Sequence, residues 1–253
     1  MTTATTTTAA PFAGRVLAQA RFEAGILLRN GEQMLVSIIL PLMTLVGLTL
    51  APFPDLGEHE RIDVVAPGVL GLVVMSTAFT GQAIQTGFDR RYGVLRYLGT
   101  TPLGRGGLLA AKGVAVAAVL VLQLAVLAAV AVAMGWRPQL AWLPVAILTL
   151  ALGTWCFVAL ALALAGVLRA EAVLALANLV WVLLLAVGGV VIPATALHAS
   201  ADAVVRWLPS AALGDGLREP LLHGGLPLLP WLVLVVWAAA ATVLAARTFR
   251  WSD

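Results

Sequence analysis

The chain has 253 residues, of which 61% are hydrophobic and 11% are charged. A soluble domain carries about 25% charged residues, so this composition excludes a water-soluble globule, a disordered chain and a nucleic-acid-binding tail. The fold class that remains is an all-α integral membrane protein.

The first residues predict a tail followed by an interfacial helix. Residues 1–11 are rich in Thr and Ala and contain no basic residue, so we expect a disordered tail and no cleaved signal peptide. Residues 12–31 predict an amphipathic helix in which Val16 and Leu27 lie opposite Arg15. Such a helix lies in the membrane interface, with its arginines among the lipid headgroups.

Six charge-free runs of 22 to 31 residues follow along the chain. A bilayer core of about 30 Å needs about 20 apolar residues in a helix, so each run holds one span. A single six-span domain over residues 1–253 leaves too few residues for a soluble catalytic domain. Between the last two spans we expect short, partly embedded helices on the outer face. The predicted spans are residues 34–52, 66–88, 110–134, 142–168, 172–192 and 228–246.

The basic residues predict the orientation of these spans. When the spans alternate in direction, 11 cations fall on the side of the two termini and 4 on the other side. The positive-inside rule then places both termini in the cytoplasm. Arginine outnumbers lysine 14 to 1 and alanine is abundant, which is typical of a bacterium with a GC-rich genome, so we expect a bacterial plasma membrane.

The sequence offers little chemistry for an enzyme. His59, His198 and His223 all fall in outer segments, the only cysteine is Cys156, and no carboxylate lies deep in a span. We therefore expect no catalytic residue and no metal site in this chain. The motif G-x-x-x-x-G-K-[ST] is also missing, so any ATP that drives transport must be bound by another subunit.

A few uncharged polar residues do fall within the predicted spans. Most such side chains form hydrogen bonds between helices. Gln82, Gln85 and Thr86 are spaced to share one helix face at the cytoplasmic end of the second span. We take these three, together with Thr44 and Asn178, as the candidate substrate path.

The cytoplasmic loop between the second and third spans has the pattern of a short amphipathic helix. Asp89 is placed to begin it, Tyr92, Leu95 and Leu98 form an apolar stripe, and Gly99 to Pro102 would end it. This pattern predicts a contact for a cytoplasmic partner. The candidate residues of the contact are Asp89, Arg90, Arg91, Tyr92, Gly93, Leu95, Arg96, Tyr97, Leu98, Thr101, Pro102 and Arg105.

Three ordered motifs carry a resemblance to a known family. They are Leu27-Leu28-Arg29-Asn30 before the apolar run with Pro41, Tyr92-Gly93-Val94-Leu95 with Thr101-Pro102-Leu103 and Lys112, and Trp207-Leu208-Pro209 before Asp215-Gly216-Leu217-Arg218. With these motifs the chain resembles the membrane subunits of type-two ATP-binding cassette exporters, the family of drug-resistance and polysaccharide-export permeases.

The resemblance implies a half-transporter that dimerises with a second copy or with a sister permease. Two ATPase subunits would bind ATP and Mg²⁺ and dock on the loop helix, which would act as a coupling helix, while this chain would hold no cofactor. Pro209, Asp215 and Arg218 would belong to an outer gate. The function expected is ATP-driven export of a hydrophobic or amphipathic small molecule, with a drug or antibiotic favoured. The alternatives are a secondary transporter or channel without an ATPase and, far behind, a membrane enzyme that uses the outer histidines.

Overall fold

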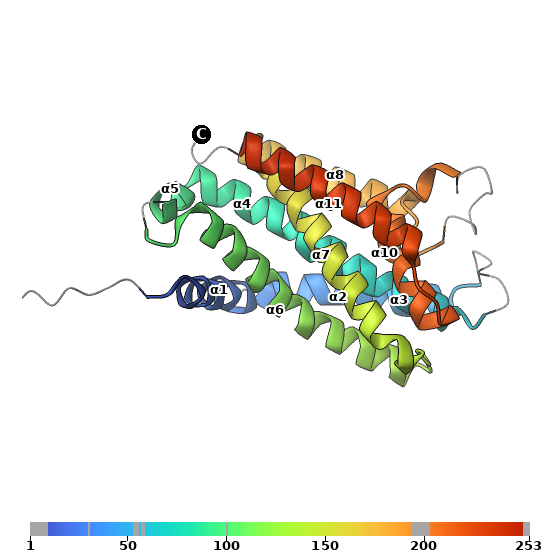
Figure 1. Ribbon diagram of the computed structural model, residues 1–253. Helices are drawn as coiled ribbons and strands as arrows, with labels where there is room; N and C mark the ends of the chain where they lie inside the picture. The colour runs from blue at the N-terminus through green and yellow to red at the C-terminus, as the bar shows by residue number, and fades with distance from the viewer. Residues whose placement is uncertain are drawn as a thin grey trace, which may run out of the picture.

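The computed structural model describes residues 10–29, 31–52, 56, 59–99, 101–193 and 203–249, and every regular element in these ranges is a helix (Figure 1). The expected disordered tail lies outside the described residues as far as residue 9. In chain order the elements are α1 (Phe12–Arg29), α2 (Gly31–Leu50), α3 (Arg61–Val74), η1 (Met75–Gly81), α4 (Gln82–Arg91), α5 (Val94–Gly99), α6 (Gly104–Ala133), η2 (Leu140–Trp142), α7 (Leu143–Ala165), α8 (Ala170–Val187), α10 (Pro209–Arg218), η4 (Glu219–His223) and α11 (Leu228–Thr248).

Apolar helices of membrane-spanning length make up most of the bundle. Among the described residues, five helical segments are long and apolar enough to cross a bilayer, and α2 adds the shorter apolar stretch Ser37–Leu50. The five segments are Arg61–Arg91, Gly106–Ala133, Leu140–Ala165, Ala170–Val187 and Leu228–Thr248. The chain is therefore an all-helical membrane protein, as its composition predicts.

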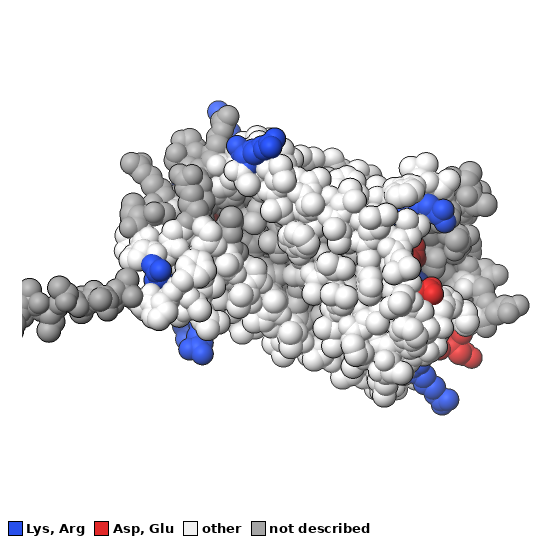
Figure 2. Space-filling view, viewed as in Figure 1, with Lys and Arg blue, Asp and Glu red and all other residues white. Residues whose placement is uncertain are grey.

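Charged side chains gather towards the two ends of the bundle, and the band between them is almost free of charge on the face that Figure 2 shows. The end that carries α5 also carries α1 and the C-terminal end of α11, whereas α10 and the start of α3 lie at the opposite end (Figure 1). Such a distribution is what a hydrocarbon layer around the middle of the bundle requires, because an unpaired charge there is costly.

The second predicted span is part of one continuous helical segment, Arg61–Arg91. In its middle, η1 is a π-helix of seven residues with wider turns than the α-helices on either side. The segment continues past Asp89, so this residue does not begin the loop helix as the sequence pattern predicts. The helix breaks instead at Tyr92 and Gly93, where Gly93 has φ of +73°, and α5 starts at Val94. Only glycine adopts that backbone conformation without strain, which explains the position of the break.

The fifth predicted span, residues 172–192, is helical only as far as Val187. Gly189 has φ of +71°, a left-handed conformation that cannot continue an α-helix. The Gly188 N–H still donates to the Leu184 carbonyl at 2.9 Å, and the chain after it leaves helical geometry at the end of the bundle opposite α5, which we call the outer end. The backbone carbonyls of this stretch therefore need donors from elsewhere in the protein.

The helix α10 is embedded in the outer half of the bundle. It begins at Pro209, where the missing N–H costs nothing, and it packs against α3, α7 and α11. Nearly all of its residues, from Pro209 to Leu217, are buried apart from Asp215. This is the partly embedded outer helix expected between the last two spans. Between α8 and α10, residues 194–202 lie outside the described part of the chain.

The burial of α10 predicts a difference in thiol reactivity. In a Cys156→Ala background, Ala212→Cys on α10 should react with a membrane-impermeant maleimide at least about tenfold more slowly than Val204→Cys in solubilised protein, because burial requires local unfolding first. Ala212 is 2% exposed and Val204 is 70% exposed. Gel-shift labelling over time measures both rates, and equal rates would place α10 on the surface.

Candidate functional site

The inner side of α5 packs onto the bundle. Leu95 is 1% exposed and lies in a small apolar cluster with Val16 and Ala20 of α1 and Leu108 of α6. This cluster is separate from the main core of the bundle. Burial of a leucine side chain contributes about 2 kcal/mol, so α5 is fixed to α1 and α6 by its own apolar contacts.

The side of α5 that faces away from the bundle, together with Tyr92 just before the helix, presents aromatic and apolar side chains to solvent. Tyr92, Val94 and Tyr97 are all exposed, with 71% of the first tyrosine and 73% of the second accessible. We call these three residues the α5 surface. Exposed tyrosines of this kind are enriched in protein interfaces, because the ring gives apolar contact area and the hydroxyl remains solvated.

A buried ion pair network, the charge triad, joins α1, α4 and α6 behind α5. Lys112 of α6 donates to Asp89 Oδ2 at 2.8 Å and to Glu23 Oε2 at 3.3 Å. The Lys112 side chain is 2% exposed and that of Glu23 is 6% exposed. Gln19 also donates to Glu23, at 3.0 Å. Charges this deep are retained only when they are paired, so the triad fixes three helices relative to one another.

Two members of the charge triad were not among the candidate residues of the sequence analysis. Lys112 is the only lysine of the chain and stands at the start of a long apolar run, which is a signal that sequence inspection offers. Glu23 lies on the polar face predicted for the interfacial helix, and nothing in its spacing indicates a contact with a residue 89 positions away. Such a pairing depends on how helices pack in three dimensions.

Two of the arginines predicted for the coupling contact are bound to other parts of the bundle. Arg90 is 4% exposed and donates to the carbonyls of Ala165, at 2.8 Å, and Leu168, at the end of α7. These carbonyls have no partner within their helix, so Arg90 acts as its C-terminal cap. Arg91 pairs with Glu171 on the exposed start of α8. Arg90 thus contacts protein on all sides and offers no charge to a cytoplasmic partner.

The remaining candidates of the loop shape the turn that follows α5. The Thr101 hydroxyl donates to the carbonyl of Leu98 at 2.6 Å, and Arg15 of α1 donates to the carbonyl of Pro102. The first contact closes the turn at the end of α5, and the second connects this turn to α1. The side chains of Arg96 and Arg105 lie outside the described part of the structure.

The candidate substrate path is only partly assembled. Gln82 and Thr86 are both buried and their side chains are hydrogen-bonded to each other at 2.9 Å, while Gln85 is half-buried beside a cavity. Thr44 donates to the Leu40 carbonyl of its own helix, and Asn178 does the same with Leu174 on the exposed face of α8. The structure therefore brings together the three residues of α4 and leaves Thr44 and Asn178 apart from them.

A second group of polar side chains, centred on Gln123 of α6, lies in the middle of the bundle and was not among the candidate residues predicted from the sequence. The Gln123 side chain of α6 is 1% exposed and accepts a hydrogen bond from the Thr77 hydroxyl at 2.8 Å. The Gln123 amide donates to Ser37 Oγ of α2, also at 2.8 Å. Near it, Trp181 of α8 donates to Ser76 Oγ at 2.9 Å. These bonds link α2, η1, α6 and α8 without any charge.

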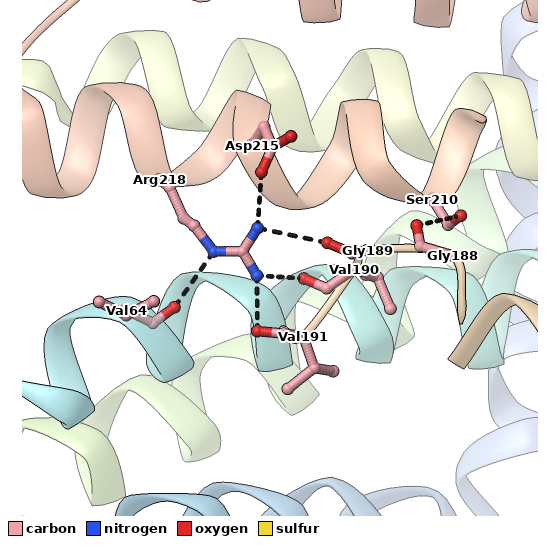
Figure 3. A network of polar contacts seen from close by, with 8 residues as sticks. All are labelled: Val64, Gly188, Gly189, Val190, Val191, Ser210, Asp215 and Arg218. Carbon is pink, nitrogen blue, oxygen red and sulfur yellow. Dashed lines mark hydrogen bonds and ion pairs between the residues drawn. The ribbon is translucent and has the colours of Figure 1, made fainter. Parts of the chain in front are cut away.

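The outer end holds a buried arginine that is fully enclosed by oxygen atoms (Figure 3). Arg218 is 4% exposed and lies at the end of α10. Its guanidinium group has five N–H donors, and it forms five hydrogen bonds. The acceptors are the carbonyls of Val64 (3.3 Å), Gly189 (3.3 Å), Val190 (2.7 Å) and Val191 (2.6 Å) and Asp215 Oδ1 (2.8 Å). We call this arrangement the guanidinium cage.

The guanidinium cage provides the donors that the non-helical stretch after α8 requires. Three of its four carbonyls come from that stretch, and the Ser210 hydroxyl donates to a fourth carbonyl there, that of Gly188, at 2.8 Å. Val64 contributes the contact to α3, and Asp215 supplies the compensating negative charge. The predicted gate residues Asp215 and Arg218 are thus in direct contact, and Pro209 is buried at the other end of the same helix.

Two of the three histidines predicted for the outer segments contact each other in the described structure. His59 and His223 meet edge to face with ring centroids 5.4 Å apart, and His198 lies outside the described residues. Within the ranges that the structure describes, no three His, Cys, Asp or Glu side chains gather closely enough to hold a metal ion.

A comparison with protein families gives one match over most of the chain. The model of the ABC-2 type transporter family matches residues 16–222, a range that runs from α1 through η4. It includes the charge triad, α5 and the guanidinium cage. No curated protein matches the chain.

The guanidinium cage predicts that Gly68 of α3 tolerates no side chain. A Cβ atom on Gly68 would lie 2.6 Å from the Val190 carbonyl oxygen and 2.7 Å from Arg218 Nη2. Gly68→Ala should therefore destabilise the protein by about 1–3 kcal/mol through overpacking. Gly47→Ala is the matched control, because a Cβ there meets nothing within 4 Å. Thermal unfolding in detergent measures both, and equal melting temperatures would contradict this packing.

The charge triad predicts a strong effect of removing its only cation. Lys112→Met leaves Glu23 and Asp89 without a counter-charge and should destabilise the protein by about 3–5 kcal/mol. Adding Asp89→Asn to Lys112→Met removes one of the unpaired charges and should restore part of the loss. Thermal unfolding of the single and double variants tests this, and additive losses would show that the triad is not coupled.

Proposed function

Because the chain belongs to the ABC-2 type transporter family, we propose that it is the permease subunit of an ATP-driven exporter for a hydrophobic or amphipathic small molecule. Family membership makes the chain a membrane permease of the ABC class. The proposal adds the direction of transport, the class of substrate and the coupling to separate ATPase subunits, which would bind the ATP and Mg²⁺. We propose a bacterial plasma membrane with both termini in the cytoplasm, which is the orientation favoured by the basic residues.

The observation that carries the coupling is the way in which α5 is connected. Its inner side is fixed to α1 and α6 through Leu95, and its outer side is the exposed α5 surface. A force on Tyr92 or Tyr97 is therefore passed to a packed contact. A partner that docks on this surface moves α5 together with the helices behind it.

The charge triad extends this connection into the bundle. Asp89 lies in the last turns of α4, Lys112 lies in the first turns of α6, and α5 lies between them in the chain. Displacement of α5 therefore pulls on two spans that are already tied to each other and to α1 through Lys112. In this proposal the predicted arginines act unequally, because Arg90 holds α7 and takes no part in docking.

The apolar character of the lateral grooves supports a hydrophobic or amphipathic substrate. A groove of about 400 Å³ lies between η1, α7, α8 and α11, and Phe79, Phe157 and Trp237 are part of its wall. Ligand sites of this size and composition select by shape and apolar contact. Within the range of such substrates, a drug or antibiotic is our first choice.

Exposed apolar faces on α2 and α8 support pairing with a second permease. Ile39 and Met43 of α2 and Leu179 and Leu183 of α8 are all exposed, at 46–67%. A second copy of this chain, or a sister permease, would cover part of these faces, and lipid would cover the rest.

The coupling is tested at the α5 surface. Tyr92→Ala combined with Tyr97→Ala should lower the amount of cassette ATPase recovered with the tagged permease by about tenfold or more. The reason is that tyrosines which become buried when a partner binds are frequent hot spots of interfaces. Efflux should fall in parallel. The matched control is Leu140→Ala, which removes an equally exposed apolar side chain (72%) at the opposite end of the bundle. Quantitative mass spectrometry of the purified complex and dye efflux from membrane vesicles provide the two measurements.

Two outcomes would contradict the proposal. One is purification of the tagged wild-type chain from its native membrane without any cassette ATPase. The other is unchanged ATPase recovery and efflux in the double tyrosine variant, while Leu140→Ala behaves in the same way.

A further inference from the structure

A small cavity lined by both polar and apolar residues, which we call the polar chamber, lies between α1, α2, α6 and the η1–α4 segment. Its volume is about 60 Å³, which is room for about two water molecules. The polar side chains in its wall are Ser37, Ser76, Thr77, Gln82, Gln85 and Gln123. All six are uncharged, and the remaining wall is formed by glycine and apolar residues.

Two of the polar side chains that line the chamber have hydrogen-bonding capacity beyond their contacts with the protein. The Gln123 amide has two N–H donors and an oxygen with two lone pairs, and its contacts with Ser37 and Thr77 use one donor and one lone pair. Ser76 donates to the Leu72 carbonyl and accepts from Trp181, which leaves one lone pair. At membrane depth such capacity must be met by water or by a ligand group.

The wall of the chamber includes the π-helix η1. Ser76, Thr77 and Gly81 all belong to this element, which is set between two α-helical stretches of the same span. A π-helix is rare, is less stable than a continuous α-helix and occurs frequently at functional sites. Here it presents two hydroxyl groups of the same span to the chamber.

The chamber lies next to the charge triad. Gln85 of the chamber wall precedes Asp89 by four residues on α4, and Val116 of the wall follows Lys112 by four residues on α6. These two wall residues are therefore each about one helical turn from a triad residue. A movement of α4 or α6 that starts at the triad therefore changes the chamber first.

We propose that the polar chamber is a subsite for one uncharged hydrogen-bonding group of the exported molecule, a hydroxyl or an amide, whose apolar remainder lies outside it. This inference rests on the proposed function and names the chemistry of its substrate. Neutral groups are selected because the wall contains no counter-charge for an ion at this depth. The incoming group displaces the chamber water and takes over its hydrogen bonds.

The test uses a pair of probes that differ in one donor, dansylaminododecanol and its O-methyl ether. The reporter is Gly81→Cys in a Cys156→Ala background, since Gly81 lines the chamber, is half-buried, and a Cβ there would lie 3.6 Å from the Ser76 carbonyl oxygen, an ordinary contact that leaves the polar side chains intact. Hydroxyethyl methanethiosulfonate modifies this cysteine in liposomes that contain the full-length protein. The alcohol should slow the modification about fivefold or more, as expected for one added hydrogen bond, and the ether should have little effect.

Two variants and one control position make the test specific. Gln123→Leu and Thr77→Val each remove part of the polar wall and should abolish the difference between the probes; Thr77→Val conserves volume and serves where Gln123→Leu does not fold. Leu127→Cys, one turn beyond Gln123 on α6 and 1% exposed in the core, should react far more slowly than Gly81→Cys, which is half-buried. Equal protection by both probes, a preference that survives in the folded variants, or equal labelling of both cysteines would overturn the subsite.

Failure of the subsite and failure of the exporter are separated by a second measurement. The protection assay requires no ATP, whereas ATP-driven movement of the probes is measured with the ATPase complex in vesicles. Protection by the alcohol without ATP-driven movement supports the subsite and contradicts the exporter. ATP-driven movement without preference for the alcohol contradicts the subsite and supports the exporter.

Discussion

The cost of leaving a charge or a backbone carbonyl without a partner in an apolar environment determines both ends of this bundle. At the outer end, the chain leaves helical geometry after Val187, and three of the five hydrogen bonds of Arg218 go to the carbonyls that are exposed there. At the other end, Arg90 caps α7 in the same way. The buried arginines are thus consequences of where the helices stop.

One helical segment contributes a residue to the guanidinium cage, to the polar chamber and to the charge triad. Along Arg61–Arg91, the carbonyl of Val64 accepts from Arg218, Thr77 donates to Gln123, and Asp89 pairs with Lys112. The guanidinium cage, the polar chamber and the charge triad therefore follow one another along a single helical segment. The π-helix η1 lies between the first and the last of these contacts, where a change of helical register would alter their relative rotation.

The sequence predicted the features that depend on local pattern. Five of the charge-free runs overlap the helical segments that are long enough to cross a bilayer, and the first run overlaps the shorter apolar stretch of α2. The apolar stripe around Leu95 falls on α5. Asp89 was wrongly expected to begin that helix, because the preference of Asp for helix starts was outweighed by the continuation of the span to Arg91. The partners of Arg90, Lys112 and Arg218 are far away in the chain, and only the packing of helices decides them. The basic character of the loop therefore overstated the charge available for docking.

The buried cations Lys112 and Arg218, which lie at opposite ends of the bundle, differ in how firmly they fix their partners. A guanidinium is planar and its five donors are fixed in direction, so the acceptors of Arg218 must keep their positions. An ammonium is compact and its donors rotate freely, so Lys112 can follow Glu23 or Asp89 when either helix shifts. The outer end is consequently rigid, while the end beside α5 tolerates changes of partner distance. In the proposed coupling, a displacement of α5 would therefore act on Lys112, whose hydrogen-bond partners can change distance, while the acceptors of Arg218 keep their positions.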